Sequence, residues 1–510
     1  MELNNIIFSL FLIFFGYFFS KYLLLIFKKS KTNLLADNQF QKLQAFHENS
    51  TYRLGGIIIF FLLILVFLYL YFSRNIFSSE YVSFCTLFFL LGSGVWIGLA
   101  LMGVAYVGME IFTVRPAGDA MITTIWTTSS SWSLTALPLF IWMGEILYRT
   151  KLSEDLFKGL APWMNNLPGR LLHTNIVGCT FFAAVSGSSA ATLTTVGKMS
   201  IPELRKRNYP ENLTIGTLAG SATLGLMIPP SLTLIVYGVT INESIIQLFM
   251  AGIFPGLVLA LLFMTYVGTW ATINKDKMPP KDPQISFMEK IKSSRFLIPI
   301  FSLIIFVIGS MYMGWATPTE AAAFGVVGGL ILATLQGSLN LKTFLASLIG
   351  ATKTSCMIAF ILAGGAFLTL SMGFTGLPRF IAEWIGSLGL SNFQLLMCLM
   401  VFYIVLGCFL DGISSIVLTM AVIEPMIRDA GINVIWFGIY LTVLVEMAQI
   451  TPPVGFNLFV LQGMTKHEML FLAKSALSMF LMMVVMVFIL IAFPELATYL
   501  PSTIRGPGPG

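Results

Sequence analysis

The sequence predicts an all-α polytopic membrane protein, and three observations support that prediction. Of the 510 residues, 57% are hydrophobic and only 10% are charged, whereas about a quarter of the residues in soluble domains are charged. The apolar residues form continuous runs, as spanning helices do, rather than the alternating pattern of barrel strands. The third observation is a repeated pattern in which prolines interrupt apolar runs. Soluble enzymes and nucleic-acid-binding domains are excluded, because so few charges cannot cover a water-facing surface.

Apolar runs follow one another along the chain, and no connection between them is long enough for a soluble domain. The fourteen runs cover residues 3–27, 55–73, 81–112, 120–148, 171–197, 212–240, 243–273, 296–315, 319–336, 341–371, 378–409, 411–427, 432–463 and 467–493. Basic connections at 28–53 and 274–295 should face the cytoplasm by the positive-inside rule. We expect two extra transmembrane helices in residues 1–80, a unit at 81–500 with repeat halves at about 81–275 and 296–500, and a flexible tail at 501–510.

The internal repeat becomes visible when the sequence is shifted by 223 residues. SGSSAATLTTVGKMSIPELRKR and GLMIPPSLTLIVYG then align with LDGISSIVLTMAVIEPMIRDAG and AQITPPVGFNLFV. The identities pair Pro202 with Pro425, Arg205 with Arg428, and Pro229–Pro230 with Pro452–Pro453. Four identities at one offset, in a chain with 22 prolines, indicate two related copies.

Proline pairs inside apolar runs have a structural consequence in a bilayer. Every backbone N–H and C=O in the hydrocarbon region must be paired, and Pro–Pro leaves carbonyl groups without a helical donor. Irregular backbone at that depth lines a cavity or binds an ion. Gly/Pro-interrupted segments at corresponding positions of two halves indicate the binding site of a secondary transporter.

Residues 171–197 allow two interpretations. They could form one spanning helix, or two half-helices that meet at the SGSS stretch as a re-entrant hairpin. The small residues there could also serve only to let neighbouring helices approach closely. The matching LDGISS stretch and the two Pro–Pro interruptions favour the hairpin, so we expect one re-entrant hairpin in each half.

Both copies contain oxygen ligands suited to a hard cation such as sodium. Unwound backbone releases carbonyl groups, serine and threonine add hydroxyls, and glycine lets consecutive carbonyls point at one centre. In the first copy the expected sodium ligands are Ser186, Gly187, Ser188, Ser189, Gly225 and Pro229, together with Ser231 nearby. In the second copy they are Asp411, Gly412, Ser414, Ser415, Thr451, Pro452 and Gly455.

Acidic residues in or beside apolar runs are secondary candidates. Asp411 is costly within an apolar run and therefore indicates function, although it could instead cap a helix at a hydrated end. Glu145, Glu424 and Glu446 are each expected to pair with a basic residue, for example Glu424 with Arg428. The sequence contains no phosphate-binding glycine loop, no zinc-protease motif and no adjacent aspartates. We therefore expect no catalytic residue, no enzyme activity, no cofactor, and no metal other than sodium.

The repeat motifs identify a family resemblance. AVSGSSAATLTTVGKMSIPELRKR, the IPPS segment, GCFLDGISSIVLTMAVIEPMI and EMAQITPPVGFNLFVLQGMT occur in family order. From about Gly92 to about Phe493 the chain resembles the large membrane subunit of the tripartite ATP-independent periplasmic (TRAP) transporters. The resemblance covers about four fifths of the chain, and its several spaced motifs make it specific.

The resemblance implies a fold, an activity and partners. Members of the family import dicarboxylates and other organic acids with sodium across the bacterial inner membrane. They receive the acid from a periplasmic binding protein and work with a small four-helix membrane subunit. The fold would be an inverted-repeat elevator, in which two re-entrant hairpins slide against scaffold helices. Each hairpin tip and its Pro–Pro break would form a sodium site, with the carboxylate between them. The expected substrate contacts are Ser189, Thr223, Ser231 and Asn457.

The N-terminus departs from the family pattern, because residues 1–80 predict two helices rather than the four of a small subunit. FHENSTYRLGGIIIF, residues Phe46 to Phe60, resembles the opening of membrane prenyl-phosphate sugar-phosphate transferases, whose aspartate-rich loops are absent here. The alternatives to a transporter are therefore such a transferase and a passive anion channel. Sodium dependence separates the three, since a transferase needs a divalent metal and a channel needs no binding protein. The acid carried is not determined by this sequence.

Overall fold

The computed structural model describes residues 95–280, 286–376, 388–407, 410–452 and 455–503, isolated positions between 377 and 387, and the short strands β1 (Ala36–Asp37) and β2 (Thr51–Tyr52). These strands pair antiparallel. All other regular structure in the described residues is helical, in agreement with the predicted class. The expected N-terminal helices, the transferase-like stretch apart from β2, and the end of the tail lie outside the described residues.

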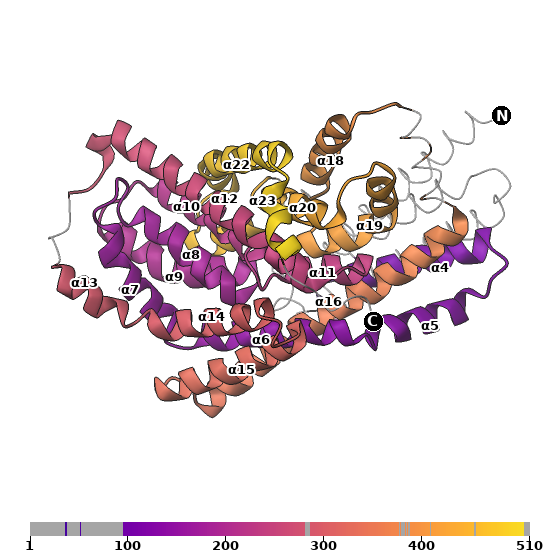
Figure 1. Cartoon of the computed structure of the whole chain (residues 1–510), viewed down its shortest axis with the longest axis horizontal. Coiled ribbons are helices and arrows are strands. Elements are labelled where there is room, and N and C mark those ends of the chain that lie inside the picture. The colour runs from indigo at the N-terminus through magenta and orange to yellow at the C-terminus, as the bar shows by residue number, and fades with distance from the viewer. Residues whose placement is uncertain are drawn as a thin grey trace.

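The first half of the described chain is a series of helices separated by short breaks (Figure 1). They are α4 (Ile97–Phe112), α5 (Ala117–Ser129), η3 (Trp132–Thr135), α6 (Ala136–Arg149), α7 (Leu152–Met164), α8 (Leu172–Ser186), α9 (Ser189–Lys206), α10 (Glu211–Thr223), η4 (Leu224–Leu226), α11 (Leu232–Ile241), α12 (Ile245–Ile273) and η5 (Lys275–Lys277).

The second half continues in the same way. Its helices are α13 (Phe287–Ser294), α14 (Ile298–Tyr312), α15 (Pro318–Leu335), α16 (Leu341–Thr375), α18 (Asn392–Gly407), α19 (Gly412–Asp429), α20 (Val434–Gln449), α21 (Phe456–Thr465), α22 (Met469–Ala492) and α23 (Glu495–Thr503).

Several expected spans are divided into shorter helices. Among the described residues, four helices are long and apolar enough to cross a bilayer alone, namely α12, α15, α16 and α22. The pair α13 and α14, bent by 54°, would make a fifth. Five further apolar helices have 10–17 residues, and four of these adjoin the glycine- or proline-containing breaks. The chain is therefore a multi-pass membrane protein in which many apolar runs are interrupted.

The 223-residue repeat is present in the helix boundaries. Helix α9 begins at residue 189 and α19 at residue 412, which is 223 residues later, and both have 18 residues. Helix α10 begins at 211 and α20 at 434, again 223 residues later. Because the same spacing holds for helix starts and for prolines inside helices, the two copies share local structure as well as sequence.

Polar contacts, one a hydrogen bond and one an ion pair, link the two copies reciprocally. Arg205 Nη2, at the end of α9, lies 3.4 Å from His467 Nε2 in the connection between α21 and α22. Arg428 Nη2, at the equivalent end of α19, lies 3.2 Å from Glu243 Oε1 in the connection between α11 and α12. Each arginine thus reaches the corresponding connection of the other copy. A reciprocal exchange of this kind is what an approximate two-fold relation produces.

The described helices pack in two groups that touch. We call α4, α5, α6, α15 and α16 the support group, because α16 packs along α4, α5 and α6 while α15 packs on α6. In Figure 1, α15, α6 and α5 run along the lower edge, and α16 rises from there toward α4 at the right. In the second group, α10 packs against α8, α9 and α22, and α12 packs against α22 and α23. The two groups meet where α6 contacts α8 and where α16 contacts α19.

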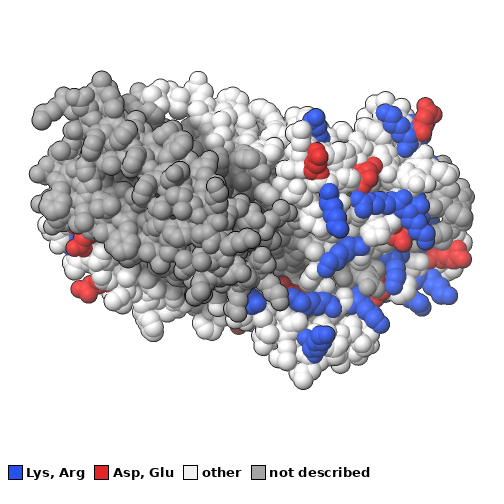
Figure 2. All heavy atoms as spheres, turned by 180° about the vertical axis from the view of Figure 1, so that it is seen from behind, with Lys and Arg blue, Asp and Glu red and all other residues white. Residues whose placement is uncertain are grey.

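On the face shown in Figure 2, the basic residues that the structure describes gather at one end. Helices α7 and α13, which pack together, lie at that end. Trp163 Nε1 on α7 donates to Ser294 Oγ on α13 at 2.9 Å, so the basic connection 274–295 is fixed to the rest of the protein. This is the connection that the positive-inside rule places in the cytoplasm.

Candidate functional site

The SGSS stretch is a helix break, and α8 and α9 on either side of it pack together. A membrane re-entrant hairpin at this break stays a prediction. Helix α8 ends at Ser186, and Gly187 takes a left-handed conformation with φ of 60°. Ser188 then caps α9, its Oγ accepting from Ala191 N at 3.5 Å. Ser186 Oγ lies 2.8 Å from Thr192 Oγ1 across the break. The positive φ explains the glycine, because L-residues are disfavoured in that region.

This break packs directly against the first proline pair. Leu232 N donates to Gly187 O at 3.2 Å. A Cβ atom on Gly187 would lie 2.5 Å from Pro230 O, and one on Gly225 would lie 2.8 Å from Ser188 O. Glycine at both positions therefore lets two backbone segments approach more closely than any other residue would allow. The predicted sodium ligands of the first copy are brought together in this way.

The proline pair changes the hydrogen bonding of its helix as expected. Pro229 and Pro230 have no N–H to donate to the carbonyls of Gly225 and Leu226, four residues earlier. Leu226 O instead accepts from Ser231 Oγ, and Ser231 also caps α11 by accepting from Leu234 N at 3.2 Å. The serine thus compensates for one proline. Gly225 O has no helical donor and lies at the break, where the sequence predicted a cation ligand.

In the second copy, Asp411 is the N-cap of α19. Its Oδ2 accepts from Ile413 N at 3.2 Å and from Ser414 N at 3.3 Å. Its Oδ1 accepts from Ser414 Oγ, and Ser415 Oγ donates to Asp411 O at 2.9 Å. The capping role that the sequence left open is therefore present. A cation ligand role for Asp411 stays a prediction.

The second proline pair also interrupts a helix. Helix α20 ends at Gln449 and α21 begins at Phe456, and Pro453 lies outside the described residues. Thr451 Oγ1 donates to Met447 O at 2.7 Å. A Cβ atom on Gly455 would lie 2.7 Å from Thr451 O. Both copies thus place a glycine where backbone meets backbone at the break.

A polar contact joins the first hairpin tip to the second break. Ser189 Oγ donates to Gln449 Oε1 at 2.5 Å and lies 3.2 Å from Asn457 Oδ1. One hydroxyl proton cannot serve both acceptors, and Asn457 Nδ2 has no partner among the described residues. Turning the Asn457 amide would let this nitrogen donate to Ser189. All three side chains are buried.

The remaining expected substrate residues have local partners. Thr223 is buried, and its Oγ1 donates to Gly220 O at 2.6 Å. Ser231 is buried and holds the first break together. The structure therefore joins Ser189 and Asn457 directly, whereas Thr223 and Ser231 bond to backbone of their own copy.

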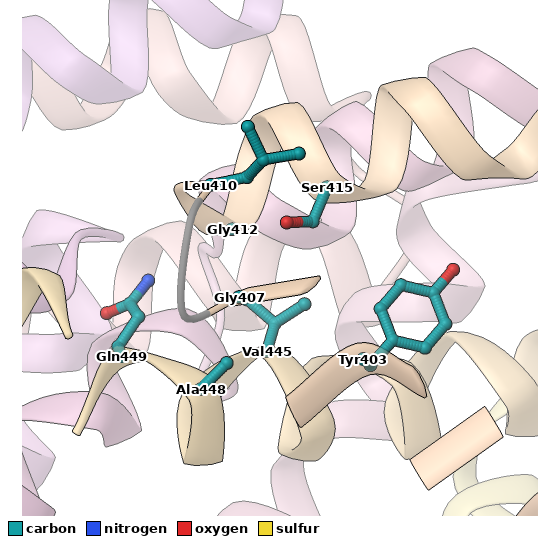
Figure 3. A pocket seen from close by; sticks show the side chains of 8 residues that line it. All are labelled: Tyr403, Gly407, Leu410, Gly412, Ser415, Val445, Ala448 and Gln449. Atoms are coloured by element: carbon teal, nitrogen blue, oxygen red, sulfur yellow. The ribbon is translucent and has the colours of Figure 1, made fainter. Parts of the chain in front are cut away.

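Close to the second tip the side chains enclose a narrow pocket (Figure 3). In Figure 3, Gln449 and Ala448 on α20 lie opposite the Leu410–Gly412 turn, with Ser415 and Tyr403 on the far side of the pocket. The full lining is Tyr403, Gly407, Leu410, Gly412, Ser415, Val445, Ala448 and Gln449. It holds no space for a water molecule. The structure therefore shows the tip and α20 in a closed arrangement.

Sequence reasoning missed Gln449, a residue that connects the two copies. Its signal was a polar side chain in an apolar run, three residues before Pro452. A Cβ atom on Gly412 would lie 3.2 Å from Gln449 Nε2, so the same amide also packs on the second tip. Gln449 thus contacts the first turns of both α9 and α19.

The acidic candidates divide into two kinds. Glu145 pairs with Arg149 at 2.7 Å, and Glu424 pairs with Arg428, as expected. The expectation was wrong for Glu446. Its side chain is completely buried in α20, and neither carboxyl oxygen has a hydrogen-bond partner among the described residues.

Comparisons with known proteins support the family resemblance. Residues 84–496 match the family model described as "Tripartite ATP-independent periplasmic transporter, DctM component". The C4-dicarboxylate TRAP transporter large permease protein DctM of Pseudomonas aeruginosa is 30% identical over 379 residues, covering 74% of this chain and 88% of that protein. The isethionate TRAP transporter permease protein DctMQ of Oleidesulfovibrio alaskensis is 28% identical over 445 residues, covering 84% of this chain and 67% of that protein.

A solved structure is similar at the level of the fold. The YdaH transporter of Alcanivorax borkumensis has a TM-score of 0.57 and 13% identity, covering 81% of this chain and 99% of that one. The family match extends over most of the chain and includes both helix breaks. The chain therefore belongs to the family of large permease subunits of the tripartite ATP-independent periplasmic transporters.

Proposed function

We propose that this permease imports small organic acids, dicarboxylates or similar carboxylates, with sodium as the coupling ion. The relatives support the substrate class, because their names specify a C4-dicarboxylate and isethionate, both small organic anions. The partners would be a periplasmic substrate-binding protein and a small four-helix membrane subunit. The location would be the bacterial inner membrane.

The observation that carries the proposal is the meeting of two interrupted helices from different copies. Gly187, Ser188 and Gly225 bring backbone oxygens together in the first copy. Ser189 then connects this break to Gln449, three residues before Pro452 of the second proline pair. Oxygen-rich breaks of this kind suit a hard cation, and two cations beside them would offset the charge of a carboxylate in a low-dielectric region.

Sodium entry would supply the driving force. Each net charge that crosses the membrane is worth about 2.3 kcal/mol per 100 mV of potential. If more sodium charges enter than the acid carries, the potential drives accumulation. The movement would be an elevator, in which the group containing α9 and α19 slides against the support group.

The test is uptake into proteoliposomes that contain the permease with its small subunit and binding protein. Uptake should require an inward sodium gradient. Asp411→Asn removes the charge while keeping an N-cap acceptor, so the sodium concentration for half-maximal uptake should rise roughly tenfold if the carboxylate binds sodium. Ser188→Ala should raise the same concentration. Asp429→Asn, at the opposite end of α19, is the matched control and should leave it unchanged.

Two results would reject the proposal. Undiminished uptake without sodium would exclude sodium coupling, and uptake without any binding protein would favour the passive anion channel. The transferase alternative rests on residues 46–60, most of which lie outside the described residues. Family membership supports a permease rather than an enzyme.

A further inference from the structure

A second cavity, separate from the helix breaks, lies between the two helix groups. It has a volume of about 460 Å³, which is within the range of small-molecule sites. Its walls come from the end of α6 and the following turn, from the middle of α9, and from the connection between α15 and α16. Its lining includes Tyr148, Arg149, Lys151, Thr195, Lys198 and Ser338.

The charge of this cavity is positive. Arg149, Lys151 and Lys198 line it, and no lining residue is acidic. Glu145, outside the lining, pairs with Arg149 at 2.7 Å and offsets one of the three cations. The charges of two lysines therefore remain without an acidic partner in the lining. A concave space lined by charges of one sign concentrates the electric field and attracts ions of the opposite sign, here anions.

An aromatic ring holds the cations near each other. Lys198 Nζ donates to Tyr148 Oη at 2.7 Å and lies 4.9 Å from the centre of the ring. The Arg149 guanidinium carbon lies 5.8 Å from the same centre. Lys198 belongs to α9, whereas Tyr148 and Arg149 belong to α6 of the support group. The positive charge is thus assembled across the boundary between the groups.

The wall also contains polar groups suited to oxygen-bearing ligands. Thr195 is buried, and its hydroxyl has no hydrogen-bond partner among the described residues. Ser338 lines the cavity from the connection after α15. Lysine and arginine, with hydroxyl donors beside them, are the groups that bind carboxylate and phosphate oxygens.

We propose that this cavity binds a small oxyanion, with carboxylate or phosphate groups, between Lys198 of α9 and Lys151 beside the support group. The bound anion would join the two groups and stabilise the arrangement seen here. The turn at Lys151 leads into α7, which packs on α13 of the basic connection. The anion would therefore enter from the side that the positive-inside rule assigns to the cytoplasm. This site goes beyond the sodium-coupled function and does not depend on it.

The test is calorimetric titration of the purified full chain, without sodium, using inorganic phosphate and succinate in detergent. A parallel titration compares nanodiscs of phosphatidylcholine with nanodiscs containing phosphatidylglycerol. Lys198→Gln and Lys151→Gln should each weaken anion binding about tenfold, equivalent to about 1.4 kcal/mol. Lys206→Gln is the matched control, since Lys206 is an exposed lysine on the same helix that does not line the cavity.

The two arms identify the source of the anion. Binding of phosphate or succinate in detergent, lost in Lys198→Gln, assigns the site to a free anion. If the protein is more stable in nanodiscs that contain phosphatidylglycerol than in nanodiscs of phosphatidylcholine, and Lys198→Gln abolishes this difference, the site is assigned to a lipid headgroup. The proposal is overturned if none of these ligands binds, or if Lys206→Gln weakens binding as much as Lys198→Gln. Neither result would bear on sodium-dependent uptake.

Discussion

Replacing Gly187 by alanine tests the central contact between the first hairpin tip and the first proline pair. Gly187 has φ of 60°, and an added Cβ would lie 2.5 Å from Pro230 O. Gly431, which follows α19, has φ of 68° and nothing within 4 Å of an added Cβ. Gly431→Ala therefore has the backbone cost without the collision and serves as the matched control.

The expected losses of unfolding free energy follow from two costs, the left-handed backbone conformation and the collision of the added Cβ. A left-handed conformation costs an L-residue roughly 1–2 kcal/mol. Overpacking a methyl group against fixed atoms adds about 1–3 kcal/mol, and the neighbour here is backbone, which cannot rotate away. Gly431→Ala should therefore reduce the free energy of unfolding by about 1–2 kcal/mol, and Gly187→Ala by about 2–5 kcal/mol.

The assay is equilibrium unfolding in mixed micelles with increasing sodium dodecyl sulfate, followed by circular dichroism. Sodium-dependent uptake provides a second measurement, because the collision lies at a predicted sodium site. Uptake should fall in Gly187→Ala and persist in Gly431→Ala. If the two variants lose the same stability, Gly187 does not contact Pro230 in the folded protein, and the argument for a site at this break fails.

Two further predictions concern polar contacts. Ser189→Ala leaves the buried amides of Gln449 and Asn457 without their shared partner and should cost about 1–3 kcal/mol in the same assay; Ser200→Ala, which removes a buried hydroxyl that has no partner among the described residues, should cost less, and equal losses would contradict the contact. The hydrogen bond from His467 to Glu211 holds the pKa of Glu211 below its ordinary value. A lowered pKa stabilises the fold above the unfolded value of about 4.3 and is lost as the pH falls through the folded pKa. The stability difference between the protein and Glu211→Gln should therefore be larger near neutral pH than in strong acid, where Glu211 is protonated in both states; a difference that persists unchanged in strong acid would contradict the lowered pKa.

Much of the fold could be predicted because it depends on local chemistry. Proline removes a backbone donor wherever it occurs, so Pro229–Pro230 predicted a helix break that the structure contains. The 223-residue offset likewise reappears in the starts of α9 and α19. Asp411 shows the limit of this reasoning, since a carboxylate in an apolar run fits both a cap and a cation ligand. The structure places the cap contacts, and sodium binding stays a prediction.

The sequence by itself determined that the chain is a helical membrane protein with two copies of an interrupted segment, because hydrophobicity, glycine and proline act over a few residues. Only the tertiary structure decided which residues of one copy contact residues of the other. Ser189 and Gln449 are 260 residues apart, and their contact depends on how both copies pack. The same holds for the Glu446 carboxyl, which has no hydrogen-bond partner in the part of the chain that the structure describes, and for the cations around Tyr148. Contacts between distant segments follow from packing and are not encoded in any single motif.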